Sequence, residues 1–219
     1  MKILDVPQSG SIAGITSSRN RNGQYRRTRA IPVNPNTTFQ GTQRSRFGDQ
    51  AQAWRNLTDA QRLGWISLAA SIIRTDALGQ TYDLTGIQCF CMVNINNLDA
   101  GNAVVADAPA LTSPAGLVTA VITSTGGTLS VAYTLTPLGS GERLFVYASP
   151  QRSPGRKFEA DLRLVHKSAA AAASPANILS DYTARFGAPV VGNKIFLSFQ
   201  VYKLGFLSAP LLTSHIVVT

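Results

Sequence analysis

Residues 194–203 read KIFLSFQVYK, and this stretch decides the fold of the C-terminal half of the chain. The intervening positions are mixed, and every second position holds a large apolar side chain: Ile195, Leu197, Phe199 and Val201. Because successive side chains of a strand point to opposite faces of a sheet, this alternation predicts a β-strand with one strongly apolar face.

Six further segments with a two-residue period lie beyond Pro109 and Pro114, separated by glycine, proline or serine. They are residues 117–123, 128–135, 142–149, 161–167, 178–185 and 211–219. Seven short strands in roughly a hundred residues are typical of a β-sandwich. We therefore expect residues 109–219 to form a sandwich domain.

The spacing of apolar residues is helical in residues 42–108, for which we expect a small helical module. Three and four residues separate members of a first apolar face, which consists of Phe47, Ala51, Trp54 and Leu57. Thr58 and Gln61 fit a capping box at the start of a second helix. That helix is expected to use Trp65, Ile66, Ala69, Ile72 and Ile73 as its apolar face.

A third helix is expected from Thr85 to a stop at Gly101, because glycine commonly follows the last helical residue. The aromatic side chains Trp54, Trp65 and Phe90 each lie on an apolar helical stripe. They are therefore predicted to form the core of the module rather than a ligand cage.

Positive charge is concentrated at the N-terminus. The first 48 residues hold eight basic residues and one acidic residue, whereas the remaining chain holds twelve basic and ten acidic residues. Residues 1–41 have few large aliphatic side chains, so they are expected to form a basic arm that is neutralised by a partner. The predicted partner-binding residues are Arg19, Arg21, Tyr25, Arg26, Arg27, Arg29, Arg44 and Arg46.

Within this arm, residues 10–31 are expected to form a hairpin that turns at Asn22-Gly23, a pair suited to a tight turn. A lone two-stranded ribbon is marginal in water, so it should require a neighbour. Pro32 and Pro35 fix the backbone of the segment that follows and exclude a helix before each of them. We expect a stiff extended connector there.

No set of residues in the sequence identifies a reaction, a cofactor or a metal, so we expect no catalytic or metal-binding residues. Cys89 and Cys91 are expected to be small buried apolar residues, because a CxC pair alone does not make a zinc site. Asp161 and His166 are five residues apart on a predicted strand and should face opposite sides. His215 is expected to be a hydrogen-bonded strand residue.

No segment approaches the roughly eighteen apolar residues of a membrane span, and the opening residues do not resemble a secretory signal. The sequence therefore predicts synthesis in the cytoplasm and no membrane partner.

The last hundred residues resemble a fibronectin type III domain. The likeness rests on the number of strands, on the penultimate strand at 194–203 and on the turn GFLSAP at 205–210, which is similar to the glycine-then-serine-proline turn of that family. The resemblance implies a fibronectin type III-like sandwich for these residues. Together with the arm and the helical module predicted from charge and periodicity, the chain is expected to be α+β, with an immunoglobulin-like sandwich at its C-terminal end.

The N-terminal half resembles uncharacterised proteins encoded by bacteriophages and prophages. The matching elements are SRNRNGQY at 18–25, IPVNPNT at 31–37, Gln43-Arg44 with Phe47 and Trp54, and Gln61-Arg62 with Trp65. This likeness covers about the first hundred residues and implies a virion structural protein in the capsid, its decoration or the tail. Its partners would be other virion proteins and copies of itself, with packaged DNA as a further partner.

Two alternatives to assembly remain open at the level of sequence. The arginines suit phosphate binding, because guanidinium groups match phosphate oxygens, and this favours a nucleic-acid-binding protein. The loops at 153–157 and 204–207 are alternatively a carbohydrate or host-surface site, although Phe206 and Leu207 would equally serve to pack against the helices.

Overall fold

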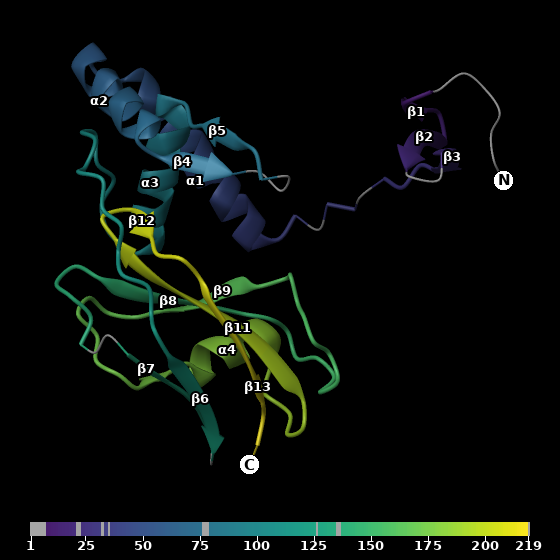
Figure 1. The fold of residues 1–219 in the computed structure, drawn as a ribbon, viewed down its shortest axis with the longest axis vertical. Helices are drawn as coiled ribbons and strands as arrows, with labels where there is room; N and C mark the ends of the chain where they lie inside the picture. Colours follow the sequence, from purple (N-terminus) through teal and green to yellow (C-terminus); the bar gives the residue numbers. More distant parts are fainter. Residues whose placement is uncertain are drawn as a thin grey trace. The chain divides into compact units, whose positions relative to one another are not determined.

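The computed structural model describes residues 8–20, 23–31, 33–34, 36–75, 79–125, 127–134 and 137–218. It divides the chain into two compact units, residues 1–43 and 44–219. The protein is mixed α+β, with helices and several antiparallel sheets, as predicted (Figure 1). Arg21, Asn22, Pro32 and Pro35, on which some of the expectations rest, lie outside the described residues.

The N-terminal unit holds an antiparallel sheet in the order β1-β2-β3, called the N-terminal sheet below. Its strands are β1 (Gly10–Ile12), β2 (Ile15–Asn20) and β3 (Gly23–Thr28). The predicted hairpin is present as β2 and β3, but β1 was not predicted. The last pair in the register is Asn20 with Gly23, and the predicted turn at Asn22-Gly23 includes Asn22, which lies outside the described residues.

Three helices and a short hairpin make up the first part of the chain after this sheet. They are α1 (Thr38–Arg55), which crosses from the N-terminal unit into the second, α2 (Asp59–Ala70), β4 (Ile73–Thr75), β5 (Thr81–Asp83) and α3 (Gly86–Asp99). The predicted capping box at Thr58 is present, and Thr85 forms a second one with Gln88. Each box satisfies backbone N–H groups that a helix start would otherwise leave unpaired.

The aromatic residues form the core of these helices, as predicted. Trp65 and Phe90 are buried, and their rings meet edge to face with centroids 5.2 Å apart. Trp54 contacts the other side of Phe90 at 5.6 Å. Some expectations were wrong: Phe47 is 57% exposed, Ile66 is 50% exposed, and Ile72 and Ile73 lie beyond the end of α2, with Ile73 in β4. An apolar spacing identifies a face of a helix but not whether a neighbour covers it.

Two antiparallel sheets form the rest of the chain. The first has the order β10-β7-β6, from β6 (Ala120–Thr125), β7 (Thr128–Tyr133) and β10 (Ala176–Asn177). In the second, β11 (Lys194–Lys203) lies between β8 (Arg143–Ala148) and β13 (Leu211–Ile216), with β9 (Arg163–Lys167) beyond β8 and β12 (Phe206–Leu207) beside the end of β11.

The alternation that defined β11 produces the core. Both sheets contribute to one cluster of buried side chains, including Val131 from β7, Val146 from β8 and Phe199 from β11. The other side of β11 is also covered, since Phe196 and Tyr202 are buried there. β11 is thus buried on both faces, and it has the same limits in the structure as in the prediction.

The predicted strand at 178–185 is wrong, because this segment is the helix α4 (Leu179–Phe186). Tyr182 and Phe186 lie one helical turn apart and their rings pack with centroids 5.2 Å apart. Tyr182 is buried, and its hydroxyl donates a hydrogen bond to the carbonyl of Ser149 at 3.1 Å. The helical spacing of these two rings decides the local structure.

The end of α3 packs on the outer face of the β8–β11 sheet (Figure 1). The hydroxyl of Tyr202 donates a hydrogen bond to Asn97 at 2.6 Å and accepts one from Asn102 at 2.9 Å. Asn96 donates to the carbonyl of Gly205 at 2.8 Å, and Phe206 is buried in the helical core. The turn at 204–207 is therefore packed against the helices.

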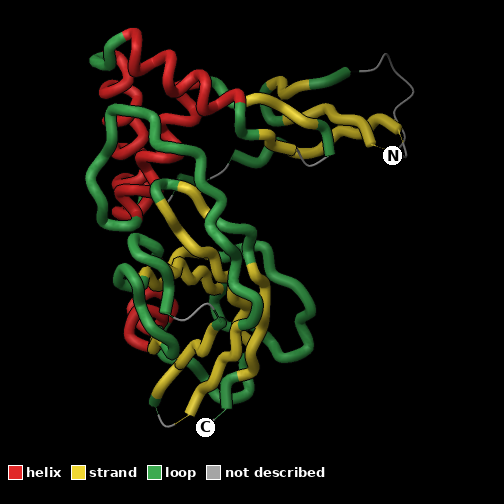
Figure 2. The backbone as a smooth tube through the Cα atoms, turned by 60° about the vertical axis from the view of Figure 1, so that its left-hand side comes forward, coloured by secondary structure: helices red, strands yellow, loops and turns green. Residues whose placement is uncertain are grey.

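Figure 2 shows the helices of residues 44–219 gathered at one end of this unit, with α4 lying beside the strands at the other. Among the described residues, none of the helices combines the length and the apolar character needed to cross a bilayer.

Candidate assembly interface

The N-terminal sheet has two different faces, which the pairing register defines. Ile12 pairs with Ile15 and Ser17 pairs with Arg26, so these side chains share one face. Arg19 lies on this face as well, two residues beyond Ser17. The opposite face carries Ser11, Thr16, Ser18, Tyr25 and Arg27. We call the first face the isoleucine face.

Both faces of this sheet carry side chains that the described residues of its own unit leave largely uncovered. None of the described residues of the unit 1–43 is buried, and Ile12 and Ile15 are 82% and 51% exposed. The isoleucine face is hollowed by a groove of about 450 Å³ lined by Ile12, Ile15, Arg26 and their neighbours. A sheet of this size gains stability mainly by covering an apolar face, so the unit presents a surface suited to a partner.

The structure places five of the eight predicted binding residues on this sheet or directly after it. Arg19, Arg26, Arg27 and Arg29 are exposed, and Tyr25 is half-buried. The backbone N–H of Arg29 donates to the carbonyl of Gly14 at 2.8 Å, which extends the pairing beyond β3. Arg26 donates to the side chain of Gln8 at 2.8 Å.

The remaining predicted residues are not brought to the sheet. Arg21 lies outside the described residues, and Arg44 and Arg46 belong to α1. Arg46 lies 2.7 Å from Asp99 in α3, and both side chains are largely covered. Its charge is therefore balanced between α1 and α3, which is a structural role.

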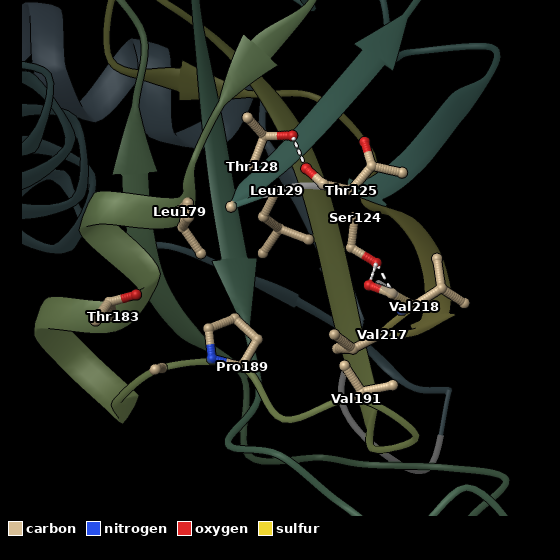
Figure 3. Close-up of a pocket in the computed structure, with 12 residues that line it drawn as sticks. Ser124, Thr125, Thr128, Leu129, Leu179, Thr183, Pro189, Val191, Val217 and Val218 are labelled. Carbon is tan, nitrogen blue, oxygen red and sulfur yellow. Dashed lines mark hydrogen bonds between the residues drawn. The ribbon is translucent and has the colours of Figure 1, made fainter.

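A second candidate site is an apolar pocket of about 470 Å³ between the ends of β6, β7 and the segment after α4. Figure 3 shows Leu129, Leu179, Pro189, Val191 and Val217 around it. None of the twelve described residues that line it is ionisable. Such a lining suits an apolar occupant but provides no acid or base.

Ser124, at the edge of this pocket, makes a contact that resembles a nucleophile and its base. Its hydroxyl oxygen lies 2.8 Å from Nε2 of His215. The same hydroxyl accepts a hydrogen bond from the backbone N–H of Val218 at 2.8 Å and lies 3.2 Å from its carbonyl (Figure 3). Ser124 is only 4% exposed, so this contact fastens the end of the chain to β6.

The two cysteines and the second histidine, which could also take part in chemistry, are either buried or paired with a neighbouring side chain. Burial raises the pKa of the Cys89 thiol to about 11, and Cys89 and Cys91 are both buried, as predicted. Nδ1 of His166 lies 2.5 Å from the carboxylate of Asp181 in α4. This pairing was not predicted, because the segment that holds Asp181 was expected to be a strand. Among the residues that the structure describes, no cluster of histidine, cysteine or acidic residues is suited to a metal ion.

Comparisons of the chain with protein-family models, with curated proteins and with solved structures found no match. A function must therefore be argued from the residues of the chain itself.

Proposed function

We propose that the chain is a non-enzymatic structural subunit of a bacteriophage particle, in the capsid, its decoration or the tail, and that it docks through the N-terminal sheet. One observation carries this proposal: the unit 1–43 forms a sheet without a single buried residue among those described, while residues 44–219 hold a complete core. A segment that cannot bury its own apolar residues gains order from contacts with another chain.

The backbone of the N-terminal sheet also supports docking. β1 and β3 are the outer strands, so each has one edge that no described strand pairs. An open edge accepts a strand from another chain and gains main-chain hydrogen bonds without needing a large core. The arginines would add attraction to acidic partners, and this attraction weakens as salt is added.

We further infer that the two C-terminal sheets form a fibronectin type III-like sandwich. The order β10-β7-β6 supports this, because it corresponds to the E, B and A strands of such a domain, and β9-β8-β11-β13 corresponds to C′, C, F and G. The short β10, followed directly by α4, stands where a longer E strand would be. Strands of both sheets contribute to one core.

Deleting residues 1–37 tests the docking role, because it removes the N-terminal sheet and leaves α1 from its first residue. The truncated chain is expected to keep the unfolding midpoint of the full chain and to lose incorporation into particles and self-association measured by light scattering. A full-length variant with Leu212→Glu, an exposed position on β13, is the control. Normal incorporation of the truncated chain contradicts the proposal.

Binding to DNA is the second candidate function, and the exposure of arginines on both faces of the N-terminal sheet favours it. Each phosphate neutralised on duplex DNA contributes about −0.9 to the slope of log K against log salt. A salt series with duplex and single-stranded DNA measures this slope. Absence of binding at low salt removes this candidate, whereas a steep slope that disappears with residues 1–37 supports it.

A further inference from the structure

Helix α2 carries a second apolar stripe beside its buried face, and Ile66, in the middle of it, also lies against Gly86 at the start of α3. Leu63, Ile66 and Ala70 follow one another at steps of three and four residues, so they share one face. Trp65, Leu68 and Ala69 occupy the buried face. The solvent-facing side of an amphipathic helix normally holds polar residues. This second apolar face is therefore a candidate binding surface.

This α2 stripe is open in the single chain and acidic at one end. Leu63 is 63% exposed and Ile66 is 50% exposed. Asp59 lies one turn before Leu63, and its side chain is 93% exposed. Arg62 donates to Asp59 at 2.9 Å and to the carbonyl of Arg55 at 2.8 Å, but such an exposed ion pair exchanges partners at little cost.

The isoleucine face of the N-terminal sheet has the complementary pattern. Ile12 and Ile15 lie side by side on neighbouring strands, with Cβ atoms about 5 Å apart in such a pair. This separation is close to the 5–6 Å or so between Leu63 and Ile66. Arg26 lies about 7 Å further along the strands, which is near the rise of about 6 Å from Leu63 back to Asp59.

We propose that the isoleucine face of one copy docks on the α2 stripe of a second copy, with Arg26 or Arg19 at Asp59. This inference rests on the proposed function, because it names the surface that receives the N-terminal sheet. The occupant is a second copy because the proposed function brings many copies together, and because Arg19 and Arg26 of the isoleucine face are opposite in charge to Asp59 of the stripe. Docking covers two apolar faces at once and pairs opposite charges.

Disulfide trapping tests the contact directly. Ile15→Cys protein is mixed with Leu63→Cys protein, with oxidised glutathione as the oxidant, and the cross-linked heterodimer is measured on a non-reducing gel. The matched control replaces the second protein by Leu212→Cys, since Leu212 is 62% exposed and Leu63 is 63% exposed. The native cysteines Cys89 and Cys91 are buried and form no competing cross-link.

The Leu63 mixture is expected to cross-link at least tenfold faster than the Leu212 mixture. Equal rates overturn the proposal. A preference that is strong within an Ile15→Cys/Leu63→Cys double variant at high dilution, but missing from the mixture, also overturns it, because the sheet would then dock on its own chain.

Charge exchange provides a second, independent readout. Asp59→Lys is added to the Leu63→Cys protein, and Arg19→Glu with Arg26→Glu is added to the Ile15→Cys protein. Each change alone is expected to slow cross-linking. When both altered proteins are mixed, cross-linking is expected to be at least fivefold faster than with either change alone. Failure of the exchange to restore trapping overturns the assigned polarity of the contact.

If deletion of residues 1–37 abolishes assembly while trapping shows no preference, the proposed function stands and this docking site falls. If the deletion leaves assembly intact, the proposed function itself falls.

Discussion

The N-terminal sheet and the sheet around β11 use the same antiparallel pairing, but they differ in what covers them. In the N-terminal sheet none of the described residues is buried, and the three strands carry only two large aliphatic side chains, Ile12 and Ile15. In β11 both faces are buried, one by the facing sheet and one in part by the end of α3. Backbone pairing is thus common to both sheets, and the burial of side chains is what differs between them.

The largest expected difference comes from removing one apolar side chain from each sheet. Phe199→Ala leaves a cavity in the common core and should lower the free energy of unfolding by about 3–5 kcal/mol. Ile12→Ala should change it by no more than about 0.5 kcal/mol, because Ile12 is exposed. Urea denaturation of both variants measures the contrast. Similar losses in the two variants would break the comparison.

A smaller loss is expected where the turn after β11 meets α3. Gly205 has φ +85°, and a Cβ added there would lie 2.4 Å from Cγ1 of Val93. Gly205→Ala should therefore lower the free energy of unfolding by about 2–4 kcal/mol, from crowding and from backbone strain together. Gly187→Ala is the control, since φ is +86° but no atom lies within 4 Å. It isolates the strain, and an equal loss in both variants would exclude crowding.

The hydrogen bonds of Tyr202 on the outer face of β11 should contribute less to the free energy of unfolding. Tyr202→Phe removes the hydroxyl that joins Asn97 and Asn102 and leaves the buried side chain of Asn97 without this hydrogen bond. The expected cost is about 1–3 kcal/mol in denaturant unfolding. Tyr82→Phe, at a position 48% exposed, should be nearly neutral. Equal stability of the two variants would show that α3 adds little to the cover of β11.

The smallest effect concerns pH and His215 on β13. Burial lowers the pKa of His215 below its ordinary value of 6.5, so the unfolded chain binds a proton at a higher pH than the folded chain. Stability should therefore decline as the pH falls below about 6.5, until the folded histidine also titrates. His215→Gln should remove this part of the pH dependence. Unfolding midpoints from pH 8 to 5 measure it, and identical profiles for both proteins would contradict the prediction.

The elements predicted correctly are those that depend on residues close together in the sequence. β11 alternates without interruption, and Thr58 with Gln61 forms a cap within a few residues. α4 was missed because the strand predicted at 178–185 takes a two-residue period from its neighbours, whereas Ile178, Tyr182 and Phe186 follow one another at steps of four. Their spacing of four residues was the available signal, and the burial of Tyr182 confirms it.

The candidate site was predictable in composition but not in arrangement. The arginine cluster is visible in the sequence, whereas the presence of Ile12 on the same face as Ile15 and Arg26 depends on β1 and its pairing with β2, which the sequence did not predict. Likewise, Phe47 and Ile66 follow a helical period, but only the tertiary packing decides that they stay exposed. Arg46 was grouped with the binding residues because its partner Asp99 is distant in sequence.

The hydrogen bonds that Tyr202 makes with Asn97 and Asn102 have a thermal consequence. They join the helices to the sheets, and the hydrogen bond between Tyr202 and Asn97 is buried, where polar groups are costly to separate. Residues 44–219 should consequently melt in one calorimetric peak whose van't Hoff and measured enthalpies agree. A molecule that binds the helices would then stabilise the sheets as well, because the two parts unfold together.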